Sequence, residues 1–266
     1  MSDKKERPGR KPRKGAGPNL GEGLGKGKVI EVQKISSEPV LAFQDLDVQF
    51  KTEFGRVHAV RGVSIDVMPG EVVALVGESG SGKSVTSTTA LGLLPGNATI
   101  DGDVTVAGQK VRGLGLRGLR NLRGKDVAMV FQEPMTALNP VLTIGRQMTE
   151  ALEQHGIAFG AAASKRAAEL LEMVGLNDAE ARIKQYPHQL SGGQRQRVVI
   201  AMAISCNPKV IIADEPTTAL DVTVQADILD LLRSLKDKLN TGILLITHSM
   251  GVVADVADTV HVMFKG

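Results

Sequence analysis

The feature that most constrains this chain of 266 residues is a glycine-rich segment, GESGSGKS, at residues 77–84. A short apolar run precedes it and a helical pattern follows it, so the segment joins a buried strand to a helix. Its glycines let the backbone curl until successive N–H groups face one hollow. That hollow and the helix N-terminus together bind phosphate oxygens. The segment therefore predicts a phosphate-binding loop, and its members are Gly77, Glu78, Ser79, Gly80, Ser81, Gly82, Lys83, Ser84 and Val85.

Two side chains of this loop supply what backbone amides cannot. Lys83 brings a point charge to the β- and γ-phosphates, and Ser84 brings a hydroxyl to Mg²⁺. The spacing G-x-x-x-x-G-K-S is matched in full, with the strand before it and the helix after it that such a loop requires. A glycine-rich turn that matches by chance is the competing interpretation, and this context disfavours it.

A second segment, VIIADEP at residues 210–216, ends a buried apolar strand in two adjacent carboxylates. Acids at the carboxyl end of a strand suit a crevice site in an open sheet. We expect Asp214 to hold Mg²⁺ and Glu215 to act as general base on the attacking water. Simple strand termination would explain one acid but explains two poorly.

A third segment, LSGGQRQR at residues 190–197, begins a helix. Ser191 is a good N-cap residue, and the glycines that follow leave backbone N–H groups accessible. Because a helix N-terminus attracts anions, this segment predicts a second anion-binding helix start. On its own, the segment is also compatible with an ordinary helix start.

The remaining pattern indicates an α/β fold, because continuous apolar runs alternate with helical periodicity. Two half-buried strands with alternating polarity are expected at residues 41–50 and 57–67. Strands covered on both faces are expected at residues 72–76, 127–131, 210–213, 243–247 and 260–264. Helices are expected at residues 143–154, 164–174, 193–205 and 223–239.

Composition narrows the class of protein. Six Phe, one Tyr and no Trp argue against aromatic platforms for nucleic acid. A single cysteine, Cys206, can form neither a disulfide framework nor a cysteine-based zinc site. No apolar run approaches the roughly 20 residues of a spanning helix, and no signal-peptide core follows Met1. We therefore expect a soluble chain with any membrane role peripheral.

The positive charge of the chain is concentrated at its start. Residues 1–28 hold nine Lys or Arg against three acids, with almost no apolar side chains. Such a composition cannot bury a core, so residues 1–38 are expected to be a disordered basic extension. Either this extension contacts anionic lipid or nucleic acid, or it only keeps the chain soluble.

Taken in order, these segments resemble the ATP-binding cassette ATPases over residues 40–266. The matching parts are the phosphate loop, Gln132 after a strand, LSGGQ at residues 190–194, the pair Asp214 and Glu215, TALD at residues 218–221, and His248 after the next strand. The resemblance implies a P-loop NTPase fold with a RecA-like core, an N-terminal antiparallel β subdomain and an inserted α-helical subdomain. It places the ATPase domain at 39–266, with the nucleotide-binding core at 39–131 and 208–266 and the helical subdomain at 132–207.

The same resemblance implies roles for individual residues with ATP and Mg²⁺. Two cassettes pack head to tail, so each LSGGQ segment closes over the ATP held by the other. The nucleotide-binding residues on that side are Ser191, Gly192, Gly193, Gln194 and Asp221. Catalytic roles fall to Glu215, His248, Gln132 and Lys83, and metal binding to Ser84, Gln132 and Asp214. An aromatic ring stacks on adenine; Phe50 fits this role by spacing, and Phe54 is the rival.

Two stretches, residues 131–152 and 186–232, resemble the importers of dipeptides, oligopeptides and nickel. This branch implies a peripheral subunit at the cytoplasmic face of the inner membrane. Its partners are two transmembrane permease subunits, a second cassette that is often a paralogue, and indirectly an extracytoplasmic solute-binding protein. The C-terminal extension common in this branch is expected to be absent, because the sequence stops at Gly266. The alternative is a soluble cassette ATPase that acts on nucleic acid or ribosomes; no specific nucleic acid is expected as a partner.

Overall fold

The computed structural model describes residues 38–218 and 220–266. The expectation of a disordered extension concerns residues 1–38, and all of these except Glu38 lie outside the described residues. Within the described residues the chain forms two sheets and two groups of helices. The predicted α/β class is thus confirmed.

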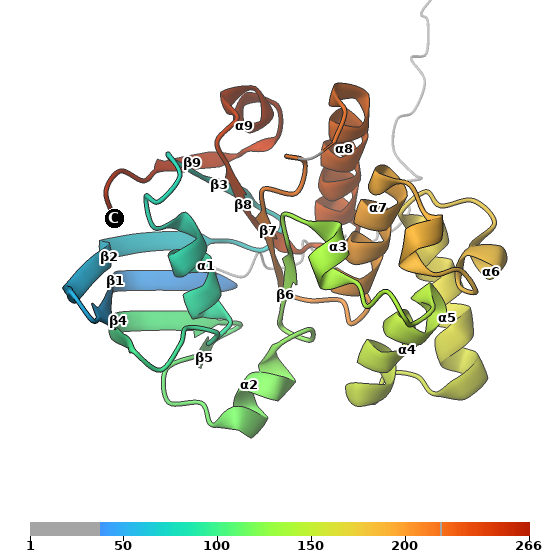
Figure 1. Cartoon of the computed structure of the whole chain (residues 1–266), viewed down its shortest axis with the longest axis horizontal. Helices are drawn as coiled ribbons and strands as arrows, with labels where there is room; N and C mark the ends of the chain where they lie inside the picture. The colour runs from blue at the N-terminus through green and yellow to red at the C-terminus, as the bar shows by residue number, and fades with distance from the viewer. Residues whose placement is uncertain (1–37, 219) are drawn as a thin grey trace, which may run out of the picture. The chain divides into compact units, whose positions relative to one another are not determined.

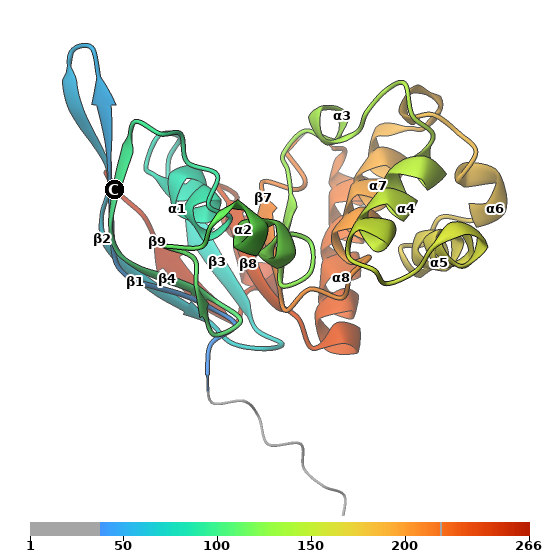
Figure 2. The ribbon, with the colours of Figure 1, turned by 90° about the horizontal axis from the view of Figure 1, so that it is seen from below.

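An antiparallel sheet is built from the first strands, drawn in blue and green in Figure 1. Its members are β1 (Leu41–Thr52), β2 (Gly55–Val67), β4 (Ala98–Val106) and β5 (Gln109–Lys110), in the order β2-β1-β4-β5. A short turn at Glu53 and Phe54 joins β1 to β2, and this hairpin extends beyond the neighbouring elements in Figure 2. The alternating segments at 41–50 and 57–67 are therefore strands, as predicted.

A second sheet is parallel throughout and carries the order β6-β7-β8-β3-β9. Its strands are β3 (Val72–Val76), β6 (Val127–Val130), β7 (Val210–Asp214), β8 (Gly242–Thr247) and β9 (Thr259–Val262). Every residue of β3 and β8 is buried, which is why these strands appear in the sequence as continuous apolar runs. β6, β7 and β8 differ from their expected bounds by one residue, whereas β9 begins one residue earlier than expected and ends two residues earlier, at Val262.

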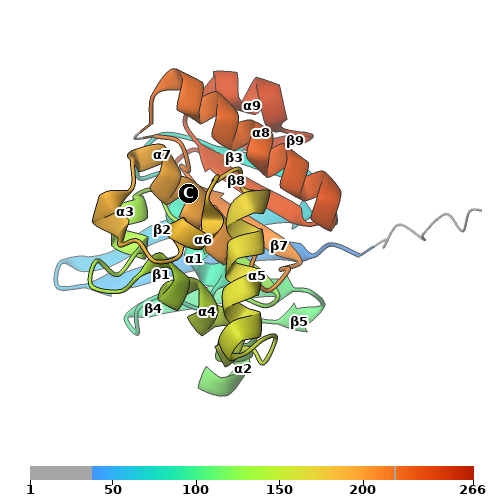
Figure 3. The ribbon, with the colours of Figure 1, turned by 90° about the vertical axis from the view of Figure 1, so that its right-hand side faces the viewer.

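Helices cover both sides of the parallel sheet. Helices α8 (Val222–Leu239) and α9 (Met250–Val256) lie together along one side of the parallel strands in Figures 1 and 3. On the other side, α1 (Lys83–Ala90) contacts strands of both sheets, so it fills the space between them. A further short helix, α2 (Leu116–Leu122), precedes β6. The phosphate-loop helix is thus wedged between the two sheets.

The chain between β6 and β7 is helical (Figure 2). It contains α3 (Pro134–Ala137), α4 (Ile144–Gln154), α5 (Gly160–Met173), α6 (Ala179–Arg182), the 3₁₀ turn η1 (Pro187–Gln189) and α7 (Gly192–Ala203). In α4, Ile144, Met148 and Leu152 recur at helical spacing and are fully buried, so this face packs inward. All four helices expected from periodicity are present within a few residues. The bounds 132–207 for a separate subdomain stay a prediction.

Two hydrophobic clusters share the parallel sheet between them. Successive residues of β7 alternate: Ile211 packs into the cluster with the helices, and Ile212 into the cluster with the antiparallel sheet. β8 alternates in the same way. Because neighbouring side chains on a strand point to opposite faces, one sheet serves both cores and holds its carboxyl edge rigidly. Across residues 38–266, position 219 aside, no helix is long and apolar enough to cross a membrane.

Candidate functional site

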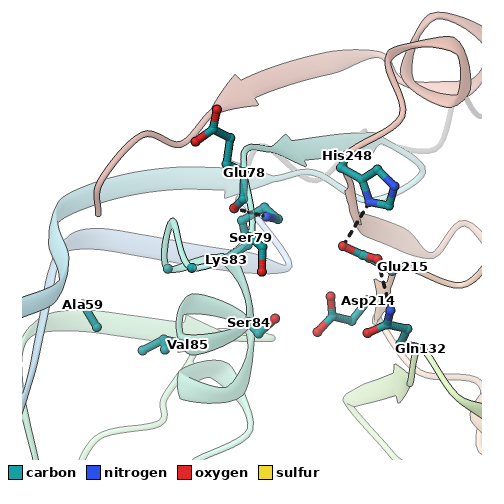
Figure 4. A pocket seen from close by; sticks show the side chains of 12 residues that line it. Ala59, Glu78, Ser79, Lys83, Ser84, Val85, Gln132, Asp214, Glu215 and His248 are labelled. Carbon is teal, nitrogen blue, oxygen red and sulfur yellow. Dashed lines mark hydrogen bonds and ion pairs between the residues drawn. The ribbon is translucent and has the colours of Figure 1, made fainter. Parts of the chain in front are cut away.

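The predicted site residues meet at one edge of the parallel sheet. The phosphate loop follows β3, Gln132 follows β6, Asp214 ends β7, and His248 follows β8. Because the four strands run parallel, their carboxyl ends lie along the same edge, which is where open α/β sheets bind ligands. The residues at this edge surround a cavity of about 640 Å³ (Figure 4). Its lining consists of Ala59, Glu78, Ser79, Gly80, Gly82, Lys83, Ser84, Val85, Gln132, Asp214, Glu215 and His248.

The phosphate loop curls around its own lysine. Lys83 Nζ donates hydrogen bonds to the carbonyl oxygens of Gly77 (2.7 Å) and Glu78 (2.8 Å), and the residue is only 6 % exposed. Gly82 has a φ of 105°, and a Cβ there would lie 2.5 Å from the carbonyl oxygen of Ala59. No side chain larger than hydrogen fits this position, so the tight curl depends on glycine.

The helix after the loop presents free amides to the cavity. α1 begins at Lys83, and its N-cap, Gly82, offers no side chain to bond the first-turn N–H groups. No acidic residue occupies the first turn either. The helix start therefore keeps its partial positive charge available for an anion.

Asp214 is a buried acid with a perturbed proton affinity. Burial raises the pKa of its carboxyl above the ordinary value of 3.8, and the nearby charge of Glu215 raises it further. A hydrogen bond with Ser84 and the ammonium of Lys83 partly oppose this shift. A carboxylate with a nearby hydroxyl forms a pair of oxygen ligands suited to a hard cation.

Glu215 is held in a defined orientation at the far wall of the cavity. Its backbone adopts a left-handed conformation with φ of 46°, which is uncommon for a residue with a side chain. Its Oε2 accepts hydrogen bonds from Gln132 Nε2 (3.2 Å) and Thr218 Oγ1 (2.9 Å), and His248 Nδ1 lies 3.2 Å from Oε1. Figure 4 shows the Gln132 and His248 contacts as dashed lines. A strained, multiply anchored acid in a cleft is typical of a functional position.

Some predicted residues lie outside this cavity. Gly77 and Ser81 belong to the loop but face away from it: the Ser81 hydroxyl is buried, and a Cβ on Gly77 would meet it. The LSGGQ segment and Asp221 are also not in the lining. Ser191 caps α7 as predicted, since its hydroxyl accepts from the Gln194 N–H (3.3 Å) and its own N–H donates to Gln194 Oε1 (3.0 Å). These residues lie exposed or half-exposed at the start of α7: Ser191, Gly192, Gly193 and Gln194.

The two candidate aromatic residues differ in environment. Phe50 is half-buried and packs against the cluster beneath the antiparallel sheet. Phe54, at the hairpin turn, is fully exposed. Neither lines the cavity. The assignment of Phe50 to an adenine contact stays a prediction.

The sequence analysis missed two contributors. Ala59 comes from β2 and reaches the cavity only because the two sheets meet beside the loop. Thr218 belongs to the TALD segment at residues 218–221, and the resemblance that singled out this segment does not predict its hydrogen bond to Glu215. The sequence signal for this contact is that Thr218 lies three residues after Glu215, an acid at the end of a strand.

Metal ligation by protein groups alone is not supported at this site. Over residues 38–218 and 220–266, no group of three or more His, Cys, Asp and Glu side chains could hold a metal ion. Asp214 and Ser84 nevertheless provide two oxygens beside the phosphate loop. This set fits Mg²⁺, which uses few protein ligands and completes its shell with phosphate oxygens and water.

Comparison with known proteins agrees with this site. Residues 60–218 match the ABC transporter family. The chain is 51 % identical over 229 residues to the oligopeptide transport ATP-binding protein OppD of Bacillus subtilis, covering 85 % of this chain and 64 % of that protein. It is 52 % identical over 231 residues to the dipeptide transport ATP-binding protein DppD of the same organism, covering 86 % and 69 %. This chain therefore spans less than two thirds of the length of OppD.

Solved structures show the same fold. A dimeric post-hydrolysis state of the ATP-binding cassette MJ0796, bound to ADP and Pi, superposes with a TM-score of 0.74 at 30 % identity. The match covers 85 % of this chain and 95 % of that one. Since the family match spans more than half of the chain and includes the cavity-lining residues from Glu78 to Glu215, this chain belongs to the ABC transporter family.

Proposed function

We propose that this chain binds and hydrolyses ATP as the motor subunit of an importer of dipeptides, oligopeptides or related small solutes. The observation that carries the proposal is the meeting of a buried phosphate-loop lysine and an anchored carboxylate at the ends of parallel strands. The transport role rests on relatives that are peptide-transport ATP-binding proteins at about half identity.

ATP binding follows from the loop and its helix. The curled backbone and the uncapped start of α1 offer N–H groups to the β-phosphate, and Lys83 exchanges its two carbonyl partners for phosphate oxygens. Asp214 and Ser84 would hold Mg²⁺, which when bound neutralises charge that develops on the phosphates. The pKa of the Asp214 carboxyl is raised mainly by burial, and a bound cation would favour its charged form.

Hydrolysis is assigned to the far wall of the cavity. Glu215 accepts a proton from a water molecule, whose oxygen bonds to the γ-phosphorus. The bond from that phosphorus to the bridging oxygen breaks, and the electron pair leaves on ADP. Gln132 and His248 orient the carboxylate before the reaction through their contacts with its two oxygens. The proton then passes to solvent.

A head-to-tail dimer completes the site in this proposal. Ser191, Gly192, Gly193 and Gln194 form an anion-binding helix start that does not line the cavity of its own chain. A dimeric cassette bound to ADP and Pi is among the structural neighbours. We place the start of α7 and Asp221 at the nucleotide of a second cassette, often a paralogue. Two permease subunits and an extracytoplasmic binding protein complete the importer at the cytoplasmic face of the inner membrane.

Glu215→Gln tests the reaction directly. The amide keeps the shape of the side chain but cannot accept the proton, so we expect turnover to fall by about 10²–10⁴-fold. ATP binding should persist and favour a trapped dimer, which size-exclusion chromatography with light scattering would detect. Glu172→Gln, at an exposed position of α5, is the matched control and should hydrolyse ATP normally. Normal steady-state hydrolysis by Glu215→Gln would refute the general-base role.

A further inference from the structure

The two oxygens of the Glu215 carboxylate have different surroundings. Oε2 accepts hydrogen bonds from two segments, through Gln132 and through Thr218, and the Thr218 bond is the shorter of the two. Oε1 has one side-chain partner, His248, whose side chain is 59 % exposed. Pinning Oε2 from two sides fixes the rotation of the carboxylate and leaves Oε1 as the oxygen open to a water molecule in the cavity.

Thr218 can hold Glu215 only if its own loop is held. This loop connects the end of β7 to the start of α8, and among its described residues the Thr218 N–H donates to the Glu215 carbonyl (3.3 Å) and the Leu220 N–H to the Thr217 carbonyl (3.1 Å). A side chain from the first turns of α8 braces it: Gln225 Nε2 donates to the carbonyl oxygens of Thr217 (2.9 Å) and Leu220 (3.0 Å). These two carbonyls flank Thr218, so one amide group fixes both sides of the residue that orients Glu215.

The brace is local to this loop. Gln225 does not line the cavity, and its side-chain amide donates to loop carbonyls rather than to groups that line it. Its backbone N–H donates to the Asp221 carbonyl as part of α8, so the side chain is attached to a rigid helix. A rigid helix can therefore control the carboxylate orientation through one amide and one hydroxyl, without touching the substrate.

We propose that Thr218 and Gln225 are positioning residues for hydrolysis, with Gln225 fixing the loop and Thr218 orienting Glu215 so that Oε1 accepts the proton of the attacking water. This inference rests on the proposed function. It predicts an effect on kcat with little effect on KM, because neither residue lines the cavity.

Isosteric variants separate positioning from packing. Thr218→Val removes the hydroxyl at an exposed position, and we expect kcat to fall about tenfold while KM for ATP stays within about twofold. Thr218→Ser retains the hydroxyl and should recover most of the lost kcat. Gln225→Leu should lower kcat by a similar factor. The double variant should be no slower than the slower single variant, because both act through the same hydrogen bond.

Thr241→Val is the matched control. Its hydroxyl also bonds a loop carbonyl, that of Pro208 (2.9 Å), but at the start of β8, the opposite end of the sheet. Thr241→Val should lower the free energy of unfolding measured with urea and leave kcat unchanged. The inference fails if Thr218→Val hydrolyses ATP at the parent rate, or if Thr218→Ser is as slow as Thr218→Val. If Glu215→Gln also hydrolyses ATP normally, the general-base role of Glu215 in the proposed function fails as well; if only Thr218→Val does, the positioning role alone is wrong.

Discussion

At the scale of single residues, Asp214 shows a conflict between stability and activity. Its pKa is raised mainly by burial, so the folded protein binds a proton more readily than the unfolded chain does. The group therefore favours folding below its ordinary value of 3.8, and this contribution is lost as pH rises through the raised folded pKa. At neutral pH the charged carboxylate destabilises the nucleotide-free protein.

Asp214→Asn should consequently increase the free energy of unfolding at pH 7, measured by urea denaturation without nucleotide. The gain should shrink as pH falls toward the ordinary value of 3.8, because the native carboxyl then also becomes neutral. Mg²⁺-dependent hydrolysis should fall by more than about tenfold in the same variant. Asp101→Asn, at an exposed surface position, controls for general charge effects. A variant less stable at pH 7 than at pH 5, relative to the parent, would contradict the burial argument.

The adenine contact is also decided by single side chains. Phe54 is fully exposed, whereas the ring of Phe50 contributes to packing beneath the antiparallel sheet. If Phe50 stacks on adenine, Phe50→Ala should weaken ATP binding about fivefold or more, because stacking a base on a ring contributes about 1–3 kcal/mol. Phe54→Ala should then leave ATP affinity unchanged. Equilibrium binding of a fluorescent ATP analogue to both variants measures this; loss of affinity in folded Phe50→Ala alone would support the assignment by spacing.

At the scale of elements, the strands buried on both faces were the easiest to predict from the sequence. The strands of the parallel sheet are apolar throughout because they are covered on both faces, so a local pattern revealed them. β4 lacks such a pattern: it contains Gly102 and two aspartates, and only pairing with β1 makes it a strand. α2 contains Gly118 and Asn121, both weak helix formers, and forms in spite of them.

The site residues also divide into those that a local motif predicts and those that only the tertiary structure brings together. Residues fixed by a short motif, such as Lys83 and Asp214, could be named because their chemistry depends on local spacing. The contact of Thr218 with Glu215 depends on the shape of a loop, and Ala59 reaches the cavity through the meeting of two sheets. Such tertiary geometry leaves no periodic trace in the sequence.

Packing between elements also limits how α7 can move. A Cβ on Gly193 would lie 2.7 Å from Val224 Cγ1, and one on Gly192 would lie 3.7 Å from Leu220 Cδ2. The start of α7 thus rests directly on the loop and helix that hold Thr218 and Gln225. Any displacement of this helix start would therefore reach the orientation of Glu215.

At the scale of the whole molecule, affinity capture tests the proposed partners. We expect affinity capture of the full, N-terminally tagged chain from gently solubilised native membranes to recover two spanning subunits and a second cassette. Mass spectrometry would identify them, and an accompanying binding protein would indicate the solute. A parallel capture with Glu215→Gln controls for loss of activity. Recovery of ribosomes or nucleic-acid-binding proteins instead would contradict the transport role and leave the ATPase proposal intact.

The phosphate loop also has a lower surface, formed by the segment after β9. Met263 lies against Gly82, the carbonyl of Met263 lies under Gly77, and the Gly266 amide donates to the Ser81 carbonyl (3.0 Å). The Gly266 carbonyl in turn accepts from the Arg61 amide (2.8 Å). The phosphate loop thus lies between this segment on one surface and the nucleotide site on the opposite surface. ATP binding and the contacts of residues 263–266 are therefore coupled. If bound ATP stabilises these contacts by some free energy, the contacts stabilise bound ATP by the same amount.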